Sequence, residues 1–281
     1  MLMERRPLLS HATCEPVIAG TVIDQNGQAV AAQLPGERPL TLYLDKTEIV
    51  TLMTLGCMPE ALVLGYLRNQ RLVENLRDIA SIQVDWEVGA AAITTVFGDA
   101  GQRCEEVLRR RTVTAGCGQG TQFGDQLERL VPLSAPGSAG SPTVARSILY
   151  SLFEQVRSLD TIYKRSGAVH GCVLADYNKG VSRVLHHVED IGRHNAVDSI
   201  SGLMWIEHAA GNDKLFYTTG RLTSEMVIKV VEMGIPILIS RSGTTEMGLE
   251  VARQCGVTLI GRARNERFLV FNGAERIDFN D

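Results

Sequence analysis

A cysteine framed by glycines stands in the segment TVTAGCGQGTQFG, residues 112–124. Cys117 has glycine on both sides, and its further neighbours are Thr and Gln rather than the apolar residues that usually surround a buried thiol. Glycine allows strained turns and lets another molecule approach the backbone closely. Nearby positive charge favours the thiolate, the reactive form of cysteine, and Arg109–Arg111 come just before the loop. The pattern predicts an exposed loop that presents one reactive sulfur.

Two similar loops that each carry one arginine follow each other in the second half of the chain. They are TGRLTSEM, residues 219–226, with Arg221, and SRSGTTEM, residues 240–247, with Arg241. Each loop follows a strand-like run and opens a helix-like one. Because helix N-termini and arginine side chains both bind anions, the loops could recognise phosphate groups. The alternative stays open that the hydroxyls only cap helices and the arginines lie in solvent.

The densest polar cluster is HHVEDIGRHN, residues 186–195. His187 and Glu189 match the H-x-E half of the zinc nucleotide deaminase signature, but the P-C-x-x-C half is missing, so we predict no metal site. A local alternative is that Asp190 caps the following helix while His194 hydrogen-bonds nearby. Since α/β folds place ligand contacts at strand ends, we interpret the cluster as pocket lining.

A turn rich in arginine, GRARNER at residues 261–267, joins two strand-like runs near the C-terminus. Arg262, Arg264 and Arg267 could pair with a polyanion such as a nucleotide diphosphate. On spacing alone, a solvated hairpin tip is the simpler interpretation.

The elements that position these groups differ between the two halves of the chain. The first half has strand-like runs and a helical pattern over residues 59–73, which predicts a mainly β domain with one prominent helix. The strand-like runs are residues 41–45, 48–55, 81–86 and 91–97. Residues 132–143 are dense in Pro, Gly, Ser and Ala, which is typical of a linker.

After this linker, a helix is predicted from Ser141-Pro142 to about Leu159, and strands then alternate with helices. Alternation of this kind predicts an α/β fold with parallel strands. We therefore expect an N-terminal domain over residues 1–131 and a C-terminal α/β domain over residues 144–281, with Cys57, Cys172 and Cys255 as structural cysteines.

Composition and missing motifs argue against several classes of protein function. The chain has 281 residues and a formal net charge of -4, which argues against nucleic-acid or membrane binding by bulk charge. We find no apolar run long enough to span a bilayer, and the N-terminus is a poor signal peptide. The six cysteines include no closely spaced pair, as expected for reduced thiols in the cytoplasm. P-loop, dinucleotide-binding and nucleophile-elbow motifs are missing.

From about residue 40 onward, the sequence resembles the formate dehydrogenase accessory sulfurtransferase family (FdhD). The resemblance lies in CGQG, SGAVHG, EDIGRHNAVD, TTGRLTSEM, SRSGTTEM and LIGRARNERFLVF. It implies a small N-terminal domain and a C-terminal domain similar to the cytidine deaminase core without its zinc. It also implies a cytoplasmic homodimer that takes persulfide sulfur from a cysteine desulfurase. The sulfur would go to the molybdenum cofactor, bis-molybdopterin guanine dinucleotide, which formate dehydrogenase needs for activity.

The resemblance assigns site residues by position. The persulfide-bearing cysteine of the family, the first of its C-x-x-C motif, corresponds to Cys117. The cofactor-contacting stretch corresponds to Arg262, Ala263, Arg264, Asn265, Glu266 and Arg267. With His194, Arg221 and Arg241 these residues form the expected cofactor site, where a GDP-like nucleotide should also bind.

The sequence departs from the family at the second cysteine of C-x-x-C, which is Gly120 here. One thiol can accept and donate a persulfide by exchange, but it cannot relay sulfur between two cysteines of the loop. A cofactor-binding chaperone without sulfur chemistry is therefore an alternative. A third, a zinc hydrolase similar to the deaminases, would require bound zinc.

Overall fold

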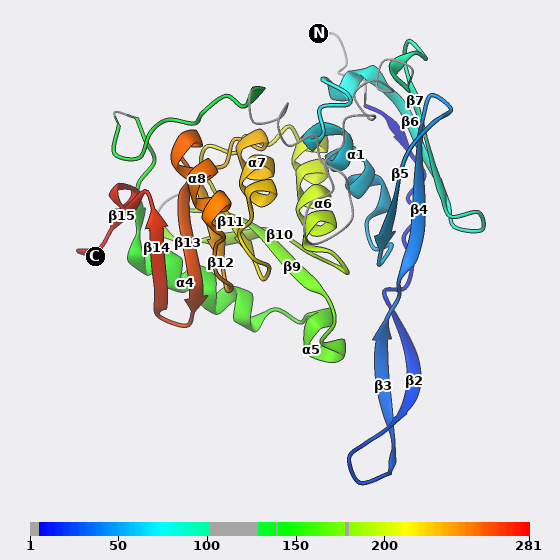
Figure 1. Cartoon of the computed structure of the whole chain (residues 1–281), viewed down its shortest axis with the longest axis horizontal. Coiled ribbons are helices and arrows are strands. Elements are labelled where there is room, and N and C mark those ends of the chain that lie inside the picture. Colours follow the sequence, from blue (N-terminus) through cyan, green and yellow to red (C-terminus); the bar gives the residue numbers. More distant parts are fainter. Residues whose placement is uncertain (1–5, 102–128, 139, 178–179) are drawn as a thin grey trace.

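The structure is a computed structural model that describes residues 6–101, 129–138, 140–177 and 180–281. Cys117, Gly120 and Arg109–Arg111 therefore lie outside the described residues. The described part of the chain contains two large sheets, one from each half of the sequence, with helices packed between them (Figure 1).

The first half builds a five-stranded sheet with the order β1-β6-β7-β4-β5. In β4, Leu40, Leu42 and Leu44 alternate with less buried residues, so one face of the strand points into the core. This face packs against helix α1, whose Pro59 occupies the first turn, where a proline costs no hydrogen bond. The elements are β1 (Leu8–Leu9), β4 (Arg38–Leu44), β5 (Thr47–Thr54), α1 (Pro59–Asn69), η1 (Leu76–Asp78), β6 (Ile79–Asp85) and β7 (Ala90–Thr95).

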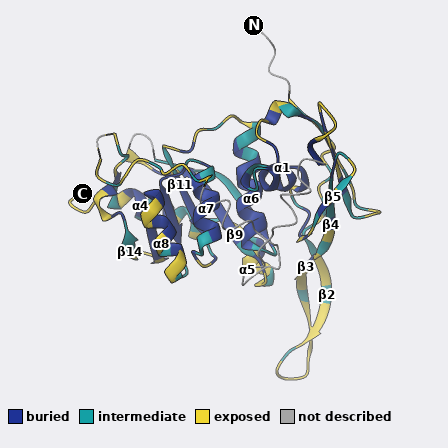
Figure 2. Ribbon diagram, turned by 45° about the horizontal axis from the view of Figure 1, so that its top comes forward, coloured by how far each residue is buried: buried dark blue, intermediate teal, exposed yellow. Residues whose placement is uncertain are grey.

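A separate hairpin of β2 (Val17–Ile23) and β3 (Ala29–Pro35) projects away from this sheet (Figure 1). Most of its side chains are exposed (Figure 2). At its tip, the Asp24 carboxylate accepts hydrogen bonds from the backbone amides of Asn26 and Gln28, which closes the turn. Neither strand of the hairpin was predicted from the sequence.

The second half builds a six-stranded sheet with the order β10-β9-β11-β12-β13-β14. The strands are β9 (His170–Asp176), β10 (Arg183–Asp190), β11 (Lys214–Thr218), β12 (Ile237–Ser240), β13 (Thr258–Arg264) and β14 (Arg267–Asn272). The three strands β11, β12 and β13 run parallel, as predicted, whereas β9, β10 and β14 pair antiparallel with their neighbours. The expectation of parallel strands is wrong for β9, because a hairpin to β10 follows it in place of a crossover helix.

Helices cover both faces of this sheet. Along β9, Cys172 and Leu174 point to a core with α6 (Arg193–Ile206), α7 (Ser224–Glu232) and α8 (Glu246–Cys255). Val173 and Ala175 point to the opposite core, which α4 (Arg146–Ser158) closes. A short helix, α5 (Ile162–Ser166), follows α4. Burial on both faces explains the continuous apolar runs of these strands. The α/β fold class is confirmed, while the likeness to the cytidine deaminase core stays a prediction.

Two predicted helices differ from the structure at one end. The helix expected from Ser141-Pro142 begins at Arg146, because β8 (Val144–Ala145) pairs with β15 (Ile277–Asp278), which follows η3 (Ala274–Arg276). The Asp281 carboxylate then accepts hydrogen bonds of 3.0 Å from the backbone amides of Arg146 and Ser147. The helix expected over residues 59–73 ends at Asn69, close to Arg71, which adopts a left-handed conformation with φ 52°.

The two halves of the chain meet where α1 crosses α6 (Figure 1). Glycines permit this crossing. A Cβ at Gly65 would overlap the carbonyl oxygen of Asp198, and a Cβ at Gly202 would overlap that of Ala61. The helix backbones are therefore in direct contact. The limits of the two predicted domains and of the linker stay predictions.

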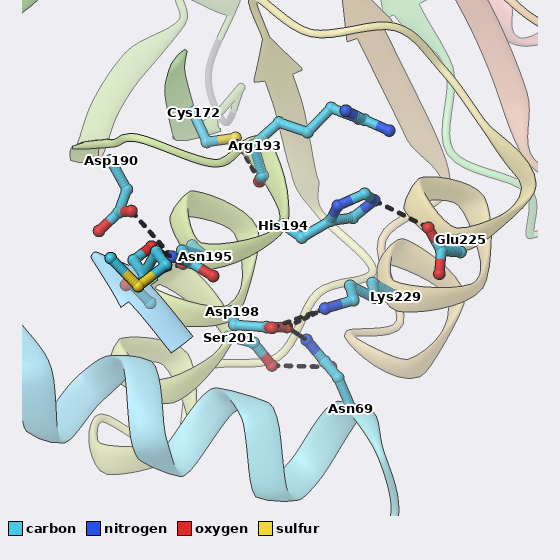
Figure 3. A network of polar contacts seen from close by, with 12 residues as sticks. Asn69, Cys172, Asp190, Arg193, His194, Asn195, Asp198, Ser201, Glu225 and Lys229 are labelled. Carbon is cyan, nitrogen blue, oxygen red and sulfur yellow. Dashed lines mark hydrogen bonds and ion pairs between the residues drawn. The ribbon is translucent and has the colours of Figure 1, made fainter. Parts of the chain in front are cut away.

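A buried polar network lies beside the same crossing (Figure 3). The Asp198 carboxylate accepts hydrogen bonds from Lys229 Nζ at 2.6 and 2.7 Å and from Asn69 Nδ2 at 2.7 Å. Ser201 Oγ donates to Asn69 Oδ1 at 3.0 Å. The network connects α6 to α7 and to the last residue of α1, so it holds both halves of the chain in register.

Candidate functional site

A cavity of about 510 Å³ opens at the edge of the six-stranded sheet where the parallel strands end. Thr219 follows β11, Arg241 follows β12, and Arg264 ends β13, so three consecutive parallel strands supply its wall. Ligands of α/β sheets bind at this edge because loops and helix N-termini converge there. Of the residues predicted from sequence, the cavity brings together Arg241, Ala263, Arg264 and Asn265.

Positive side chains outnumber negative ones in the cavity wall. Arg157 and Lys164 come from α4 and α5 and join Arg241 and Arg264. Among the described wall residues the one carboxylate is that of Glu189, which accepts hydrogen bonds from the backbone amides at the start of α5, at 2.5 and 3.1 Å. The cavity therefore has a surplus of cationic groups, which suits an anionic ligand.

Helix α5 is held against the sheet so that its side chains reach the cavity. The Thr161 hydroxyl caps the helix by accepting from the Lys164 amide, and Glu189 binds its first turn. The Arg241 guanidinium lies over the ring of Tyr163, 4.9 Å from its centroid, in a cation–π contact. This contact fixes the Arg241 side chain in the cavity wall.

A second cavity of about 940 Å³ adjoins the first along the β13–β14 turn. Arg262, Arg264, Asn265, Glu266 and Arg267 all line it, opposite residues of α4. The turn is strained, since Arg262 and Asn265 have φ of 53° and 52°. A hydrogen bond of 2.7 Å from the Arg262 amide to the Ser242 carbonyl ties it to the loop that carries Arg241. The two cavities share Phe153, Arg157, Arg264 and Asn265, so they form a continuous groove.

The two repeated loops lie side by side. Leu222 pairs with Thr244, and the Leu222 amide donates to the Gly243 carbonyl at 3.0 Å. Thr245 caps α8 by accepting from the Gly248 amide, as predicted for the hydroxyls. Thr223 makes no such bond at the start of α7. Arg221 is exposed and lines neither of these two cavities.

His194 is buried between α6 and α7 rather than in the cavity wall. Its Nε2 lies 3.0 Å from Glu225 Oε2, and desolvation lowers the pKa of its imidazole (Figure 3). Its neighbour in the predicted cluster, Asp190, accepts hydrogen bonds from Thr54 Oγ1 and Asn195 Nδ2. The sequence predicts the whole cluster as pocket lining, and His187 and Glu189 do line the cavity. Asp190 and His194 instead make contacts between helices and strands.

The sequence profile of the FdhD/NarQ family matches residues 35–278. The chain belongs to the FdhD/NarQ family. The sulfur carrier protein FdhD of Listeria monocytogenes is 28% identical over 272 residues, which cover 96% of this chain and 99% of the relative. That of Bacillus subtilis is 29% identical over 241 residues, 86% and 88% of the two chains.

A solved structure agrees with this assignment. The crystal structure of a formate dehydrogenase accessory protein from Desulfotalea psychrophila superposes with a TM-score of 0.70 at 29% identity. The superposition covers 93% of this chain and 98% of the other.

In this member of the FdhD/NarQ family, burial makes several cysteines poor nucleophiles. Desolvation raises the pKa of the Cys172 thiol to about 12 and that of Cys57 to about 11, and it also raises the pKa of Cys255. The interpretation of these three as structural agrees with their surroundings. In the part of the chain that the structure describes, no three His, Cys, Asp or Glu side chains gather at metal-ligand spacing. None of the described helices has the length and apolar character needed to cross a membrane.

Some cavity residues of this FdhD/NarQ member were missed by sequence reasoning. Arg157 belongs to a helix that was predicted without a role in the site, Tyr163 and Lys164 belong to α5, which was not predicted, and Thr219 was predicted only as part of a loop. The segment TIYKRSG carries the one signal that could have found them, two basic residues and a tyrosine between a capping threonine and a glycine.

One buried and two half-buried histidines predict a pH dependence of stability. Desolvation is the largest cause that lowers the pKa of His170, His187 and His194 below 6.5. The unfolded chain therefore binds protons that the folded chain does not, and the free energy of unfolding falls as the pH drops below 6.5. We expect urea denaturation at pH 5.5 to give a free energy lower by roughly 1 kcal/mol than at pH 7.5. His194→Gln should reduce this difference, and equal values at both pH would contradict the expectation.

Proposed function

We propose that this chain is a sulfur carrier for formate dehydrogenase that holds sulfur as a persulfide on Cys117 and delivers it to the molybdenum cofactor. The observation that carries the proposal is the cationic groove over β11, β12 and β13, in a chain whose curated relatives are sulfur carrier proteins. The name of the related structure, a formate dehydrogenase accessory protein, supports the choice of recipient.

The groove fits the phosphates of bis-molybdopterin guanine dinucleotide, bound as the substrate. Arg241 and Arg264 face the first cavity, and Arg262 and Arg267 line its continuation along the turn. Arginine binds phosphate oxygens through paired N–H donors, so these four side chains match a ligand with several phosphates. GDP carries the nucleotide end of the same ligand and should bind in the same groove.

The sulfur step requires one thiol. The Cys117 thiolate attacks the terminal sulfur of a persulfide on a cysteine desulfurase. A new S–S bond forms on Cys117, the old one breaks, and the donor cysteine leaves as a thiolate, so no net electrons are exchanged. Gly120 at the second position of C-x-x-C removes an intraloop disulfide without affecting this exchange. The proposal includes a cytoplasmic homodimer that works between the desulfurase and formate dehydrogenase.

Substitution of Cys117 separates this proposal from a chaperone function. We expect Cys117→Ala to bind GDP with unchanged affinity and to lose at least about 100-fold in activation of formate dehydrogenase, because the sulfur has no attachment point. Calorimetric titration and an activation assay with the cofactor-loaded enzyme would measure the two. Cys14→Ala, which replaces a half-buried thiol, serves as the control and should behave as wild type.

Retained activation by Cys117→Ala would contradict the sulfur carrier proposal and favour a chaperone that escorts the cofactor. Loss of both activation and GDP binding would show that the substitution disturbs the groove, and the assignment of Cys117 as sulfur carrier would then lack support.

A further inference from the structure

Arg193, the first residue of α6, is a buried cation whose charge is not balanced. The residue is only 5% exposed, yet its Nε and Nη2 make no hydrogen bond. A buried charge without a partner is costly, so proteins retain one where a ligand or another group neutralises it. The Arg193 side chain points away from the Asp198 network, as Figure 3 shows.

The backbone makes room for this side chain. A Cβ at Gly220 would lie 2.6 Å from Arg193 Cδ and 3.0 Å from its Cβ, so the arginine passes directly over the glycine. Gly220 follows Thr219, which lines the cavity of the candidate site, and its amide is bonded to Thr218 Oγ1 at 3.1 Å. Arg193 therefore contacts Gly220, the residue that follows the wall residue Thr219 in the first repeated loop.

Three arginines contribute positive charge around this position. After desolvation, Coulomb interactions with Arg193, His194, Arg241 and Arg221 lower the pKa of His170, and three of these four groups are arginines. His170 itself lies within 3.4 Å of Thr219 Oγ1 through its Nδ1. Arginines from α6 and from both repeated loops thus place positive charge near the end of the cavity next to Thr219.

The nearby buried carboxylates are bonded elsewhere. Glu225 lies against His194, Asp198 binds Lys229, Asp190 accepts from Thr54, and Glu189 binds the start of α5. None of them is paired with the Arg193 guanidinium among the described residues. The described residues therefore supply no counter-charge to this guanidinium, which leaves it available to an anionic ligand.

We infer that Arg193 anchors a binding site for a phosphate group at the start of α6, next to the cavity. The second feature of this site is the N-terminus of α6, a helix of 14 residues whose N-cap, Gly192, provides no capping side chain. Arg221 and Arg241, which act on His170 together with Arg193, add positive charge nearby. The inference rests on the proposed function for its ligand, since the phosphate belongs to the nucleotide end of the cofactor in the adjoining groove.

The test compares GDP, guanosine and inorganic pyrophosphate by calorimetric titration on the full chain. Arg193→Met keeps most of the volume and removes the charge. It should weaken binding of GDP and of pyrophosphate about tenfold or more, and leave guanosine binding unchanged. Without ligand, the Tm of Arg193→Met should equal or exceed that of wild type, because no partner is lost and an unbalanced charge is removed.

Two further variants complete the experiment. Gly220→Ala keeps the arginine but displaces its side chain, and it should weaken pyrophosphate binding in the same direction. Arg253→Met removes one charge from an exposed position on α8 and should change neither affinity nor Tm.

Unchanged binding of pyrophosphate by Arg193→Met, or no pyrophosphate binding by wild type, would overturn the phosphate site. A large drop in the Tm of the ligand-free variant would also overturn it, because it would assign Arg193 a structural partner. Neither result depends on Cys117, so the sulfur carrier proposal fails or stands by its own test.

Discussion

Gly65→Ala is expected to lower the free energy of unfolding by at least about 3 kcal/mol. The new Cβ would overlap the Asp198 carbonyl oxygen and lie 2.5 Å from its carbon and 2.8 Å from the Gly202 amide nitrogen. These are backbone atoms of a neighbouring helix, so no side chain can rotate away, and α1 must move from α6. The helix propensity gained by replacing glycine, about 1 kcal/mol, is too small to offset this.

The measurement is urea denaturation of wild type and variant, followed by circular dichroism. Gly243→Ala is the matched control, because a Cβ there meets no atom within 4 Å and the position has no positive φ. We expect the control to stay within about 0.5 kcal/mol of wild type. A Gly65→Ala variant as stable as this control would show that α1 and α6 do not cross in backbone contact.

Asp198→Ala is expected to cost about 3–5 kcal/mol, because it leaves the Lys229 ammonium buried without its carboxylate. The two side chains are 0% and 6% exposed, and Lys229 Nζ reaches both carboxylate oxygens. Asn69 Nδ2 loses its acceptor in the same variant. The loss loosens α6 from α7 and from α1 together.

A double-mutant cycle with Lys229→Met tests the cause. The double variant has no unpaired charge, so it should be more stable than Asp198→Ala alone by at least about 1 kcal/mol. Asp176→Ala is the control, since it breaks the pair with Arg183, which is 72% exposed, and should cost less than about 1 kcal/mol. Additive effects of the two buried substitutions would contradict a coupled ion pair.

Much of the fold can be predicted because its patterns are local. Alternating apolar residues predict β4, and apolar residues at helical spacing predict α1. Apolar runs bounded by loops predict the buried strands β11, β12 and β13. The strand β10 was missed because its sequence RVLHHVED is polar at its centre, and it is a strand only by pairing with β9. The β2–β3 hairpin was not predicted because most residues of both strands are exposed. Its strands therefore lack the usual contrast between a buried apolar face and an exposed polar face.

Some residues of the candidate site could likewise be predicted from the sequence, and others could not. Arg241, Arg264 and Asn265 could be predicted because each stands where a strand ends, and parallel strands bring their ends together. Tyr163 and Lys164 could not, since their place in the wall depends on Glu189 binding the start of α5. The separation of His194 from the cavity is likewise tertiary, because it follows from the contact with Glu225 on another helix.

Intact-mass spectrometry after incubation with a cysteine desulfurase and cysteine tests the central claim most directly. The account predicts that wild type gains about 32 Da for each sulfur atom bound and that Cys117→Ala gains none. If the desulfurase is active and wild type gains no mass, or if Cys117→Ala gains as much as wild type, Cys117 does not carry the sulfur.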